Sequence, residues 1–275
     1  RNLKVTVAPA SNGSVRLTAT ILGSTTGVES IGMAFKAPAK ERYLGFGERS
    51  NSVDQRGNEV ENWVGEGPYQ KDEYQVVKFF VPEWGLRDRP DATYFPIPWL
   101  LSTAGYGVLV ENPEPSYFRL GTDRKDTWSV QLNRTVDGLA QQPDDTPPPR
   151  SITLRFFAGP KPADVIRRLS GALGRQPAPA PVFFGPWLQS NESDADTIDI
   201  VDQQDVPTSV YQTYLHYLPC AGQTGNEQGQ IDRTALAHQA GMAITTYFNP
   251  MICRSLPAFP GLVSDGAITL NREGN

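Results

Sequence analysis

The hydrophobic periodicity of the chain changes near residue 160, and this change constrains the fold more than any other feature of the sequence. Before it, short runs alternate apolar and polar residues, which is typical of half-buried strands. After it, apolar runs alternate with segments of helical spacing, which indicates parallel β/α units. The sequence of 275 residues therefore predicts two different architectures in succession.

The part before the change, residues 1–160, is expected to form a β-sandwich. Turn residues such as Gly, Pro, Asn and Asp separate its runs. One interval, residues 47–73, is long, polar and glycine-rich, and we expect it to be a functional surface loop. The expected strands cover residues 3–9, 14–22, 31–37, 75–82, 106–112, 116–121, 127–132 and 151–159.

Two glycines, Gly45 and Gly47, stand in the run "GFGERS" and could suggest a phosphate-binding loop. The dinucleotide fingerprint requires a third glycine and a following helix, and the flanks here are strand-like and polar. We therefore interpret the two glycines as part of a turn or β-bulge. No nucleotide or other cofactor is expected.

Residues 161–181 are expected to be a connector helix followed by a proline-rich linker. Pro162 stands near the helix start and Asp164 in its first turn, while Gly174 and Pro177 mark its end. This order of signals is typical of helix termini.

Residues 182–275 carry the alternating pattern. The expected strands are residues 182–189, 208–215 and 242–250, and the expected helices are residues 194–204 and 232–240. A doubly wound sheet and a (β/α)8 barrel begin in the same way, so the pattern alone does not separate them. Because such a barrel usually has about 250 residues, a barrel here would be represented only by its first three β/α units.

Composition excludes several classes of partner. The net charge is −5 and the basic residues are scattered, so nucleic acid is not expected. No apolar run is long enough to cross a bilayer, so no membrane partner is expected. Two histidines and two cysteines cannot supply a usual closed zinc site, and no metal is expected. The few cysteines neither require nor exclude secretion.

Candidate binding residues lie at the carboxyl ends of the expected parallel strands, where β/α folds bind their ligands. Aromatic faces beside amide and imidazole groups suit sugars, whose C–H patches stack while their hydroxyls form hydrogen bonds. The alternative is that Trp187 and Tyr211 are core residues. The candidates are Trp187, Gln189, Tyr214, His216 and Asn249.

The two cysteines follow the second and third expected strands. Adjacent parallel strands place both following loops at one edge of the sheet, so a disulfide between Cys220 and Cys253 is open to them. Free thiols remain the alternative. A nucleophilic Cys220 with His216 as its base is disfavoured, because catalytic partners are usually distant in sequence.

Three runs occur in order along the chain: "YLGFGERSNSVDQRG", "YFPIPWLLSTAGYGVLVEN" and "FAGPKPADVIRRLSGALGRQPAPAPVFFGPW". Together they resemble glycoside hydrolase family 31, the α-glucosidase and α-xylosidase family. The resemblance implies a galactose mutarotase-like β-sandwich in front of a (β/α)8 barrel that acts on α-linked glycosides with retention.

In that family both catalytic aspartates lie on later barrel strands, so the resemblance places no catalytic residue in this chain. Asp202 and Asp205 precede the second expected strand and are expected on the far side of the barrel. The implied partners are an oligosaccharide or glycoside substrate and the remaining C-terminal part of the same enzyme. A non-catalytic carbohydrate-binding or structural protein of the same architecture is the alternative.

The resemblance also implies that a loop of the sandwich reaches over the barrel mouth. Its residues here are Asp54, Gln55, Arg56 and Trp63. The sequence departs from the family in two places that bear on specificity. Tyr214 takes the place of a sugar-binding aspartate, and residues 190–191 (Ser-Asn) take the place of an Arg-Trp pair.

Overall fold

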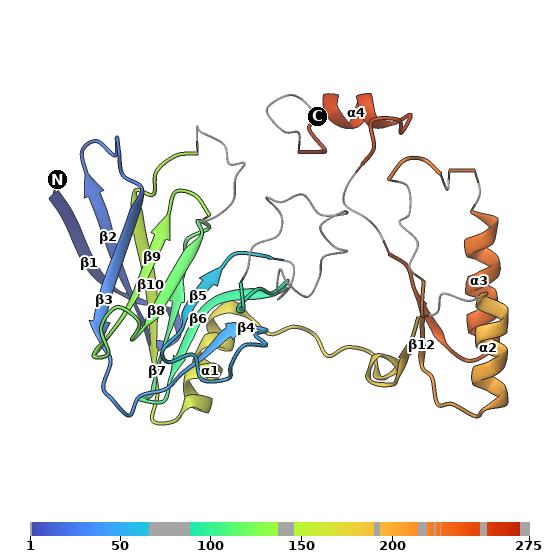
Figure 1. Ribbon diagram of the computed structural model, residues 1–275, viewed down its shortest axis with the longest axis horizontal. Helices are drawn as coiled ribbons and strands as arrows, with labels where there is room; N and C mark the ends of the chain where they lie inside the picture. Colours follow the sequence, from blue (N-terminus) through green and yellow to red (C-terminus); the bar gives the residue numbers. More distant parts are fainter. Residues whose placement is uncertain are drawn as a thin grey trace. The chain divides into compact units, whose positions relative to one another are not determined.

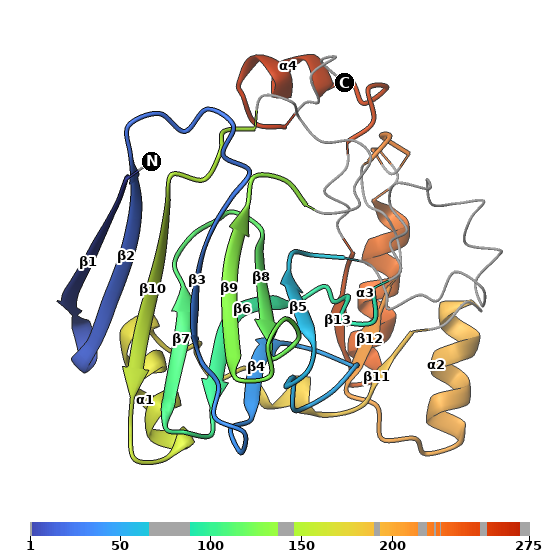
Figure 2. The same ribbon diagram turned by 60° about the vertical axis from the view of Figure 1, so that its left-hand side comes forward.

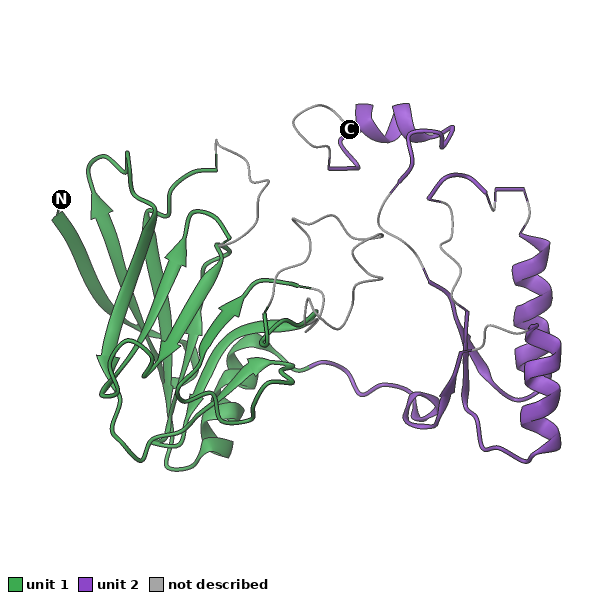
Figure 3. Ribbon diagram, in the orientation of Figure 1, with its two compact units in different colours: residues 1–175 green, residues 176–275 purple. Residues whose placement is uncertain are grey.

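The computed structural model describes residues 2–65, 89–136, 146–189, 193–213, 219–222, 224–225, 227–247 and 252–269. The chain divides into two compact units, Arg1–Arg175 and Gln176–Asn275 (Figure 3). Across the described ranges, no helix combines the length and the apolar character that crossing a membrane requires.

The first unit consists of two antiparallel sheets and confirms the expected β-sandwich (Figures 1 and 2). The six-stranded sheet has, in spatial order, β1 (Asn2–Ala10), β2 (Ser14–Leu22), β10 (Ser151–Ala158), β7 (Tyr106–Val110), β6 (Pro96–Ser102) and β4 (Tyr43–Gly47). The four-stranded sheet has β3 (Ser30–Lys36), β9 (Thr127–Asn133), β8 (Ser116–Leu120) and β5 (Glu59–Asn62). A 3₁₀ turn, Ser11–Gly13, joins β1 to β2.

The main core lies between these two sheets and follows from the alternation in each strand. In β9, Trp128, Val130 and Leu132 point inward and are fully buried, whereas the residues between them are partly exposed. The Trp128 ring stacks on Phe35 of β3 with 4.4 Å between the ring centroids. Burial of such side chains is worth roughly 1.5–3 kcal/mol each, so this interface supplies much of the stability of the unit.

The structure adds β4, β5 and β6, three strands that the alternation did not predict. β5 lies inside residues 47–73, so the expectation of one continuous loop there is wrong. β6 begins at Pro96 and contains Pro98, and prolines weaken a strand signal because they cannot donate a ladder hydrogen bond. The pairing of β4 with β6 shifts register beside these prolines. The expected strand at residues 75–82 lies outside the described residues.

The register shift in β4 is a bulge between Gly45 and Gly47, which confirms the interpretation of the two glycines. Both have positive φ, 103° and 83°, and Phe46 between them also has a φ of 71°. A Cβ on Gly47 would lie 2.0 Å from the carbonyl oxygen of Phe95. Only glycine therefore fits at position 47 without displacement of the neighbouring strand.

The expected connector helix is confirmed as α1 (Pro162–Leu173). Proline stands in its first turn, and Gly174, with a φ of 92°, follows its end. Val165 is buried against Trp99 and Phe157 on the outer face of the six-stranded sheet. The helix thus belongs to the core of the first unit.

The second unit is a parallel sheet with helices on one face, which confirms the expected alternation of strands and helices (Figure 1). Leu188, Tyr211 and Ile244 pair in register and face a small core against the helices. The elements are β11 (Trp187–Leu188), α2 (Asp194–Gln203), β12 (Val210–Gln212), α3 (Gln228–Gln239), β13 (Ala243–Thr245) and α4 (Phe259–Ser264).

The strands of this sheet are shorter than expected. Instead of a strand over residues 182–189, residues Pro181–Phe184 form a 3₁₀ helix and only Trp187–Leu188 pair with β12. Pro181 fits the first turn of a helix, and Pro186 cannot donate a ladder hydrogen bond, so the prolines restrict the strand to two residues.

Candidate functional site

Polar residues gather at the carboxyl edge of the parallel sheet, and we call Gln189, Gln212 and Thr245 the polar edge. Gln212 pairs directly with Thr245, and Gln189 follows Leu188 as Gln212 follows Tyr211. Since successive strand residues point to opposite faces, Gln212 and Thr245 lie on the face away from the helices. Neither residue was predicted from the sequence, because their common facing depends on the paired register of β12 and β13.

The strands β12 and β13 are joined at this edge by a second contact. The backbone N–H and the hydroxyl of Thr213 both donate to the carbonyl oxygen of Thr245, at 3.0 and 3.1 Å. The hydroxyl oxygen of Thr245 is buried and has no hydrogen-bond partner among the described residues. Because an unsatisfied buried hydroxyl costs roughly 1–3 kcal/mol, this oxygen is suited to bind a hydroxyl group of a ligand or a water molecule.

Trp187 is the first residue of β11 rather than its carboxyl end, and it pairs with Val210. Its side chain is 48% exposed, whereas Tyr211 is only 1% exposed. Tyr211 is therefore a core residue and Trp187 is not. The indole N–H of Trp187 donates to the carbonyl oxygen of Phe183 at 3.1 Å. This bond orients the ring and leaves aromatic surface exposed for stacking.

A buried polar contact fixes the helices behind the sheet. The Tyr211 hydroxyl donates to Asp194 Oδ1 at 2.6 Å, and Arg233 of α3 binds the other oxygen of Asp194. Burial, followed by this hydrogen bond to Asp194, raises the pKa of Tyr211 to about 12. One carboxylate thus connects β12 with the first turn of α2 and with α3. Ser193 caps the start of α2 by accepting a hydrogen bond from the backbone N–H of Asp196.

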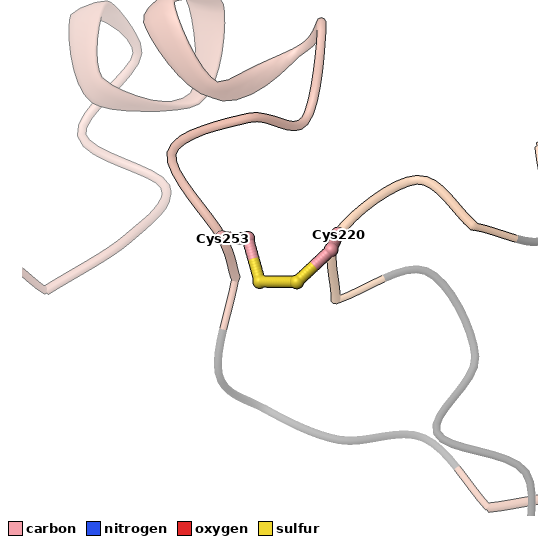
Figure 4. The surroundings of a disulfide bond; sticks show 2 residues. All are labelled: Cys220 and Cys253. Carbon is pink, nitrogen blue, oxygen red and sulfur yellow. A yellow bond between two sulfur atoms is a disulfide. The ribbon is translucent and has the colours of Figure 1, made fainter.

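Cys220 and Cys253 form a disulfide in the structure, with 4.7 Å between their Cα atoms (Figure 4). The backbone N–H of Cys253 also donates to the carbonyl oxygen of Pro219. A nucleophilic role for Cys220 is excluded in this state, because its sulfur is bonded to Cys253. The other candidates in these loops, Tyr214, His216 and Asn249, lie outside the described residues, as do residues 190–191.

In the first unit, Asp54 and Gln55 use their polar atoms within the protein. Asp54 Oδ1 accepts hydrogen bonds from the backbone N–H groups of Tyr43 and Arg56, at 3.2 and 3.0 Å. Gln55 is 1% exposed. Its amide exchanges hydrogen bonds with Asn51 and accepts one from Asn58. These contacts give the loop between β4 and β5 a defined shape.

Arg56 is the main anchor of the same loop. Its guanidinium lies 5.8 Å from the centre of the Tyr43 ring. It donates to four backbone carbonyl groups, at distances of 2.8 to 3.3 Å. These belong to Ala37, Pro38, Glu41 and Lys125.

Trp63 follows β5, and its side chain is 38% exposed. The neighbouring Asn62 is 9% exposed, and its Oδ1 accepts a hydrogen bond from Arg49 at 3.2 Å. Its Nδ2 is buried and has no hydrogen-bond partner among the described residues. The exposed face of Trp63 can stack on a sugar ring, whereas Asn62 Nδ2 lies in the interior. Asn62 was not predicted from the sequence, and its orientation depends on Arg49.

Arg49 belongs to a buried group of four charged side chains below this pair. Arg49 lies 3.3 Å from Asp91, and Arg89 lies 3.1 Å from Asp91 and 3.0 Å from Glu61. Burial lowers the pKa of Arg49 to about 10, against the opposing effect of Asp91. The group has two positive and two negative charges, and this pairing offsets the free-energy cost of removing charged side chains from water.

The chemistry of both sites is hydrogen bonding and stacking. Among the described residues, no group of three or more His, Cys, Asp or Glu is arranged to hold a metal ion. Asp202 lies at the end of α2, and Asp205 lies between α2 and β12. Both are therefore at the amino end of β12, opposite to the polar edge.

Comparison with known proteins finds a similar family for part of the first unit. Residues 22–118 match the family described as the glycosyl hydrolase 31 N-terminal galactose mutarotase-like domain. The chain is 28% identical over 175 residues to an isomaltosyltransferase of Sporosarcina globispora, a match that covers 64% of this chain and 13% of that protein. It is 21% identical over 278 residues to the α-xylosidase XylQ of Lactiplantibacillus pentosus, covering 94% of this chain and 31% of that protein.

Solved structures share the fold over nearly the whole chain. A family 31 dextranase of Flavobacterium johnsoniae, complexed with isomaltotriose, matches with a TM-score of 0.66 and 14% identity, covering 97% of this chain and 31% of that one. A cycloalternan-degrading enzyme of Trueperella pyogenes, complexed with isomaltose, matches with a TM-score of 0.63 and 16% identity, covering 99% and 42%. The chain spans less than half the length of each of these relatives.

Proposed function

We propose that this chain is the front part of a retaining enzyme of glycoside hydrolase family 31 that acts on α-linked glycosides. The observation that carries the proposal is a parallel β/α unit that follows, in the same chain, the sandwich whose residues 22–118 match the N-terminal domain of that family. In this proposal residues 1–160 are the sandwich, residues 161–181 the connector, and residues 182–275 the first three β/α units of a (β/α)8 barrel. The later units supply both catalytic aspartates.

The proposed substrate class is an oligosaccharide or glycoside with an α-linked sugar. The similar proteins include an isomaltosyltransferase, an α-xylosidase and a dextranase complexed with isomaltotriose. An oligosaccharide presents hydroxyls and apolar C–H faces together, and these match the two kinds of surface in the candidate sites. Retention requires a carboxylate nucleophile and a carboxyl acid/base about 5–5.5 Å apart, for which the later strands are the proposed source.

Within this proposal the candidate residues have separate roles. Trp187 stacks on a sugar ring, and the polar edge binds hydroxyl groups. Trp63 forms a second contact region on the sandwich. Asp54, Gln55 and Arg56 contribute by holding the loop rather than through free polar atoms. Tyr214, His216 and Asn249 retain their proposed role as substrate-binding residues at the strand ends.

The proposal is tested with two polypeptides, residues 1–275 alone and the product of the complete reading frame, on a panel of nitrophenyl α-glycosides. We expect the complete product to cleave an α-glucoside or α-xyloside, and residues 1–275 alone to cleave none. Cleavage by residues 1–275 alone would refute the placement of the catalytic carboxyl groups. Sugar binding without cleavage by the complete product would favour the non-catalytic alternative.

The polar edge is tested by Gln212→Ala in the active protein. Loss of a hydrogen bond to a sugar hydroxyl is worth about 0.5–1.5 kcal/mol, so we expect the kcat/KM to fall by roughly threefold to tenfold. Gln204→Ala is the matched control, because Gln204 is an exposed glutamine that follows α2 at the opposite end of β12. Equal effects of the two substitutions would contradict a role for the polar edge.

A further inference from the structure

The segment around Trp63 is held by a buried arginine, Arg89, which is 8% exposed. The Arg89 guanidinium donates to the carbonyl oxygens of Glu61 and Trp63, at 3.3 and 3.5 Å. It also forms an ion pair with the Glu61 carboxylate at 3.0 Å. A Cβ on Gly65 would lie 3.0 Å from Arg89 Nη1, so the guanidinium lies close to the backbone there as well. Arg89 therefore contacts every second residue from 61 to 65.

A second set of hydrogen bonds fixes the backbone on both sides of Trp63. Before it, the backbone N–H of Glu61 donates to Asp91 Oδ2 at 2.8 Å. After it, the backbone N–H of Gly65 donates to the carbonyl oxygen of Thr93 at 3.0 Å. Because the bond angles at Cα are nearly fixed, the backbone sets the direction in which the Trp63 side chain leaves the chain. The partly exposed ring is therefore carried by a backbone that is held on both sides.

The stability of the sandwich does not by itself account for a buried arginine at this position. Removing charged side chains from water has a free-energy cost, and apolar side chains of similar volume often replace buried ion pairs without loss of stability. An arginine differs from such side chains because its planar guanidinium donates to several acceptors in a fixed geometry. Arg89 uses these donors on the backbone next to Trp63, so it is suited to hold one conformation of this segment.

We propose that Arg89 is a positioning residue that holds Trp63 in place for stacking on the sugar substrate, and thereby sets the affinity for that substrate. This inference rests on the proposed function for its effect on substrate. Because Arg89 is buried, it acts on the substrate through Trp63. A side chain on an ordered backbone loses less conformational freedom when a ligand binds, and this raises affinity without a new contact.

The kinetic test compares Arg89→Lys with Arg119→Lys in the active protein. Lysine keeps the positive charge beside Asp91 and Glu61 but lacks the planar set of donors. Arg89→Lys should raise the KM about threefold to tenfold with the kcat nearly unchanged, because stacking binds the substrate and the transition state alike. Arg119→Lys is the matched control, since Arg119 pairs with Glu59 at the other end of β5, at 2.6 Å. An unchanged KM in Arg89→Lys, or an equal rise in Arg119→Lys, would overturn the proposal.

A double-variant comparison shows whether Arg89 acts through Trp63. Trp63→Ala removes the proposed stacking face. Arg89→Lys should therefore raise the KM in the unsubstituted background but not in the Trp63→Ala background. The same rise in both backgrounds would overturn the proposal, because Arg89 would then act by a route that does not include Trp63.

Hydrogen exchange keeps the positioning role separate from the proposed function. Exchange is followed by mass spectrometry in the product of the complete reading frame, in peptides covering residues 60–65 and residues 127–133 of β9. Arg89→Lys should exchange several-fold faster at residues 60–65, where the N–H groups of Glu61 and Gly65 lose their support, and at the usual rate in β9. Unchanged exchange at residues 60–65, or an equal acceleration in β9, refutes the role of Arg89 even if the protein cleaves no glycoside.

Discussion

Arg56 was expected to bind substrate, but in the structure it anchors the loop between β4 and β5. By resemblance, it is expected in a loop that contacts substrate, and an exposed arginine there could bind a sugar directly. In the structure its guanidinium donates to four backbone carbonyl groups of the first unit. The sequence locates this loop, but the carbonyl groups come from segments distant in sequence, so their convergence on Arg56 could not be read from the sequence.

The role of Arg56 is measurable as stability. Arg56→Ala removes four charge-assisted hydrogen bonds and leaves carbonyl groups unsatisfied, so we expect a loss of about 3 kcal/mol in the free energy of unfolding. Arg42→Ala is the control, because the Arg42 ion pair with Asp54 is largely exposed and is worth less than about 1 kcal/mol. Urea denaturation of both variants measures the difference. Similar losses for the two would argue against the anchoring role.

Tyr211 has a pKa raised from its ordinary value of 10.0 to about 12 by burial and by the hydrogen bond to Asp194. The folded protein therefore keeps the phenolic proton at a pH where the unfolded chain releases it. The stabilising contribution is complete below pH 10 and is lost as the pH rises from about 10 to about 12.

This pH dependence is tested with Tyr211→Phe. The variant should lose about 1 kcal/mol at neutral pH because Asp194 loses a hydrogen bond. Between pH 10 and 12, the free energy of unfolding of the unsubstituted protein should fall more steeply than that of the variant, because the variant has no phenol at this position to titrate. Parallel curves over this range would show that Tyr211 is not the group responsible.

At the scale of secondary structure, the bulge in β4 was predicted from the sequence, whereas the two strands whose pairing it interrupts, β4 and β6, were not. A pair of glycines one residue apart, without the context of a phosphate loop, indicated a bulge. The strand itself was missed because its interruption hides the alternation, and β6 was missed because of Pro96 and Pro98. Strands with regular alternation and helices with clear terminal signals were predicted from local sequence alone.

Gly47 and Gly57 allow a matched test of this bulge. Both have positive φ, 83° and 90°, but a Cβ on Gly47 would clash with the Phe95 carbonyl, whereas nothing lies within 4 Å of a Cβ on Gly57. Gly57→Ala should therefore cost about 1–2 kcal/mol of backbone strain. Gly47→Ala should cost about 2 kcal/mol more, because the clash adds to the strain. Thermal unfolding that ranks the two variants equally would contradict this assignment.

The candidate sites were also predicted from the sequence only in part. Strand order along the chain placed Gln189 at the carboxyl edge, because that edge follows from parallel topology. Trp187 was expected at the same edge but is the first residue of β11, because the strand is shorter than expected. Gln212 and Thr245 were missed because their facing depends on the register between β12 and β13. Asn62 was missed for a similar reason, since Arg49, which orients it, belongs to the stretch after β4 rather than to β5.

At the scale of the whole molecule, a β-sandwich similar to the N-terminal domain of glycosyl hydrolase 31 and a parallel β/α unit lie in one chain, which spans less than half the length of its relatives. The first unit has a complete core between its two sheets and a second core beneath α1. The second unit has a small core of a few residues between its sheet and the helices α2 and α3. The first unit therefore has a larger hydrophobic core than the second. The proposal predicts such a difference, because it treats the first unit as a whole sandwich and the second as part of a barrel whose core needs further β/α units.

The central claim is that the chain belongs to a retaining enzyme acting on α-linked glycosides, and the most direct test is the anomer of the first product. The product of the complete reading frame is mixed with the α-glycoside that it cleaves, and proton NMR spectra are recorded within the first minutes, before mutarotation. We predict that the α-anomer of the released sugar appears first and the β-anomer later. Initial release of the β-anomer would contradict the account.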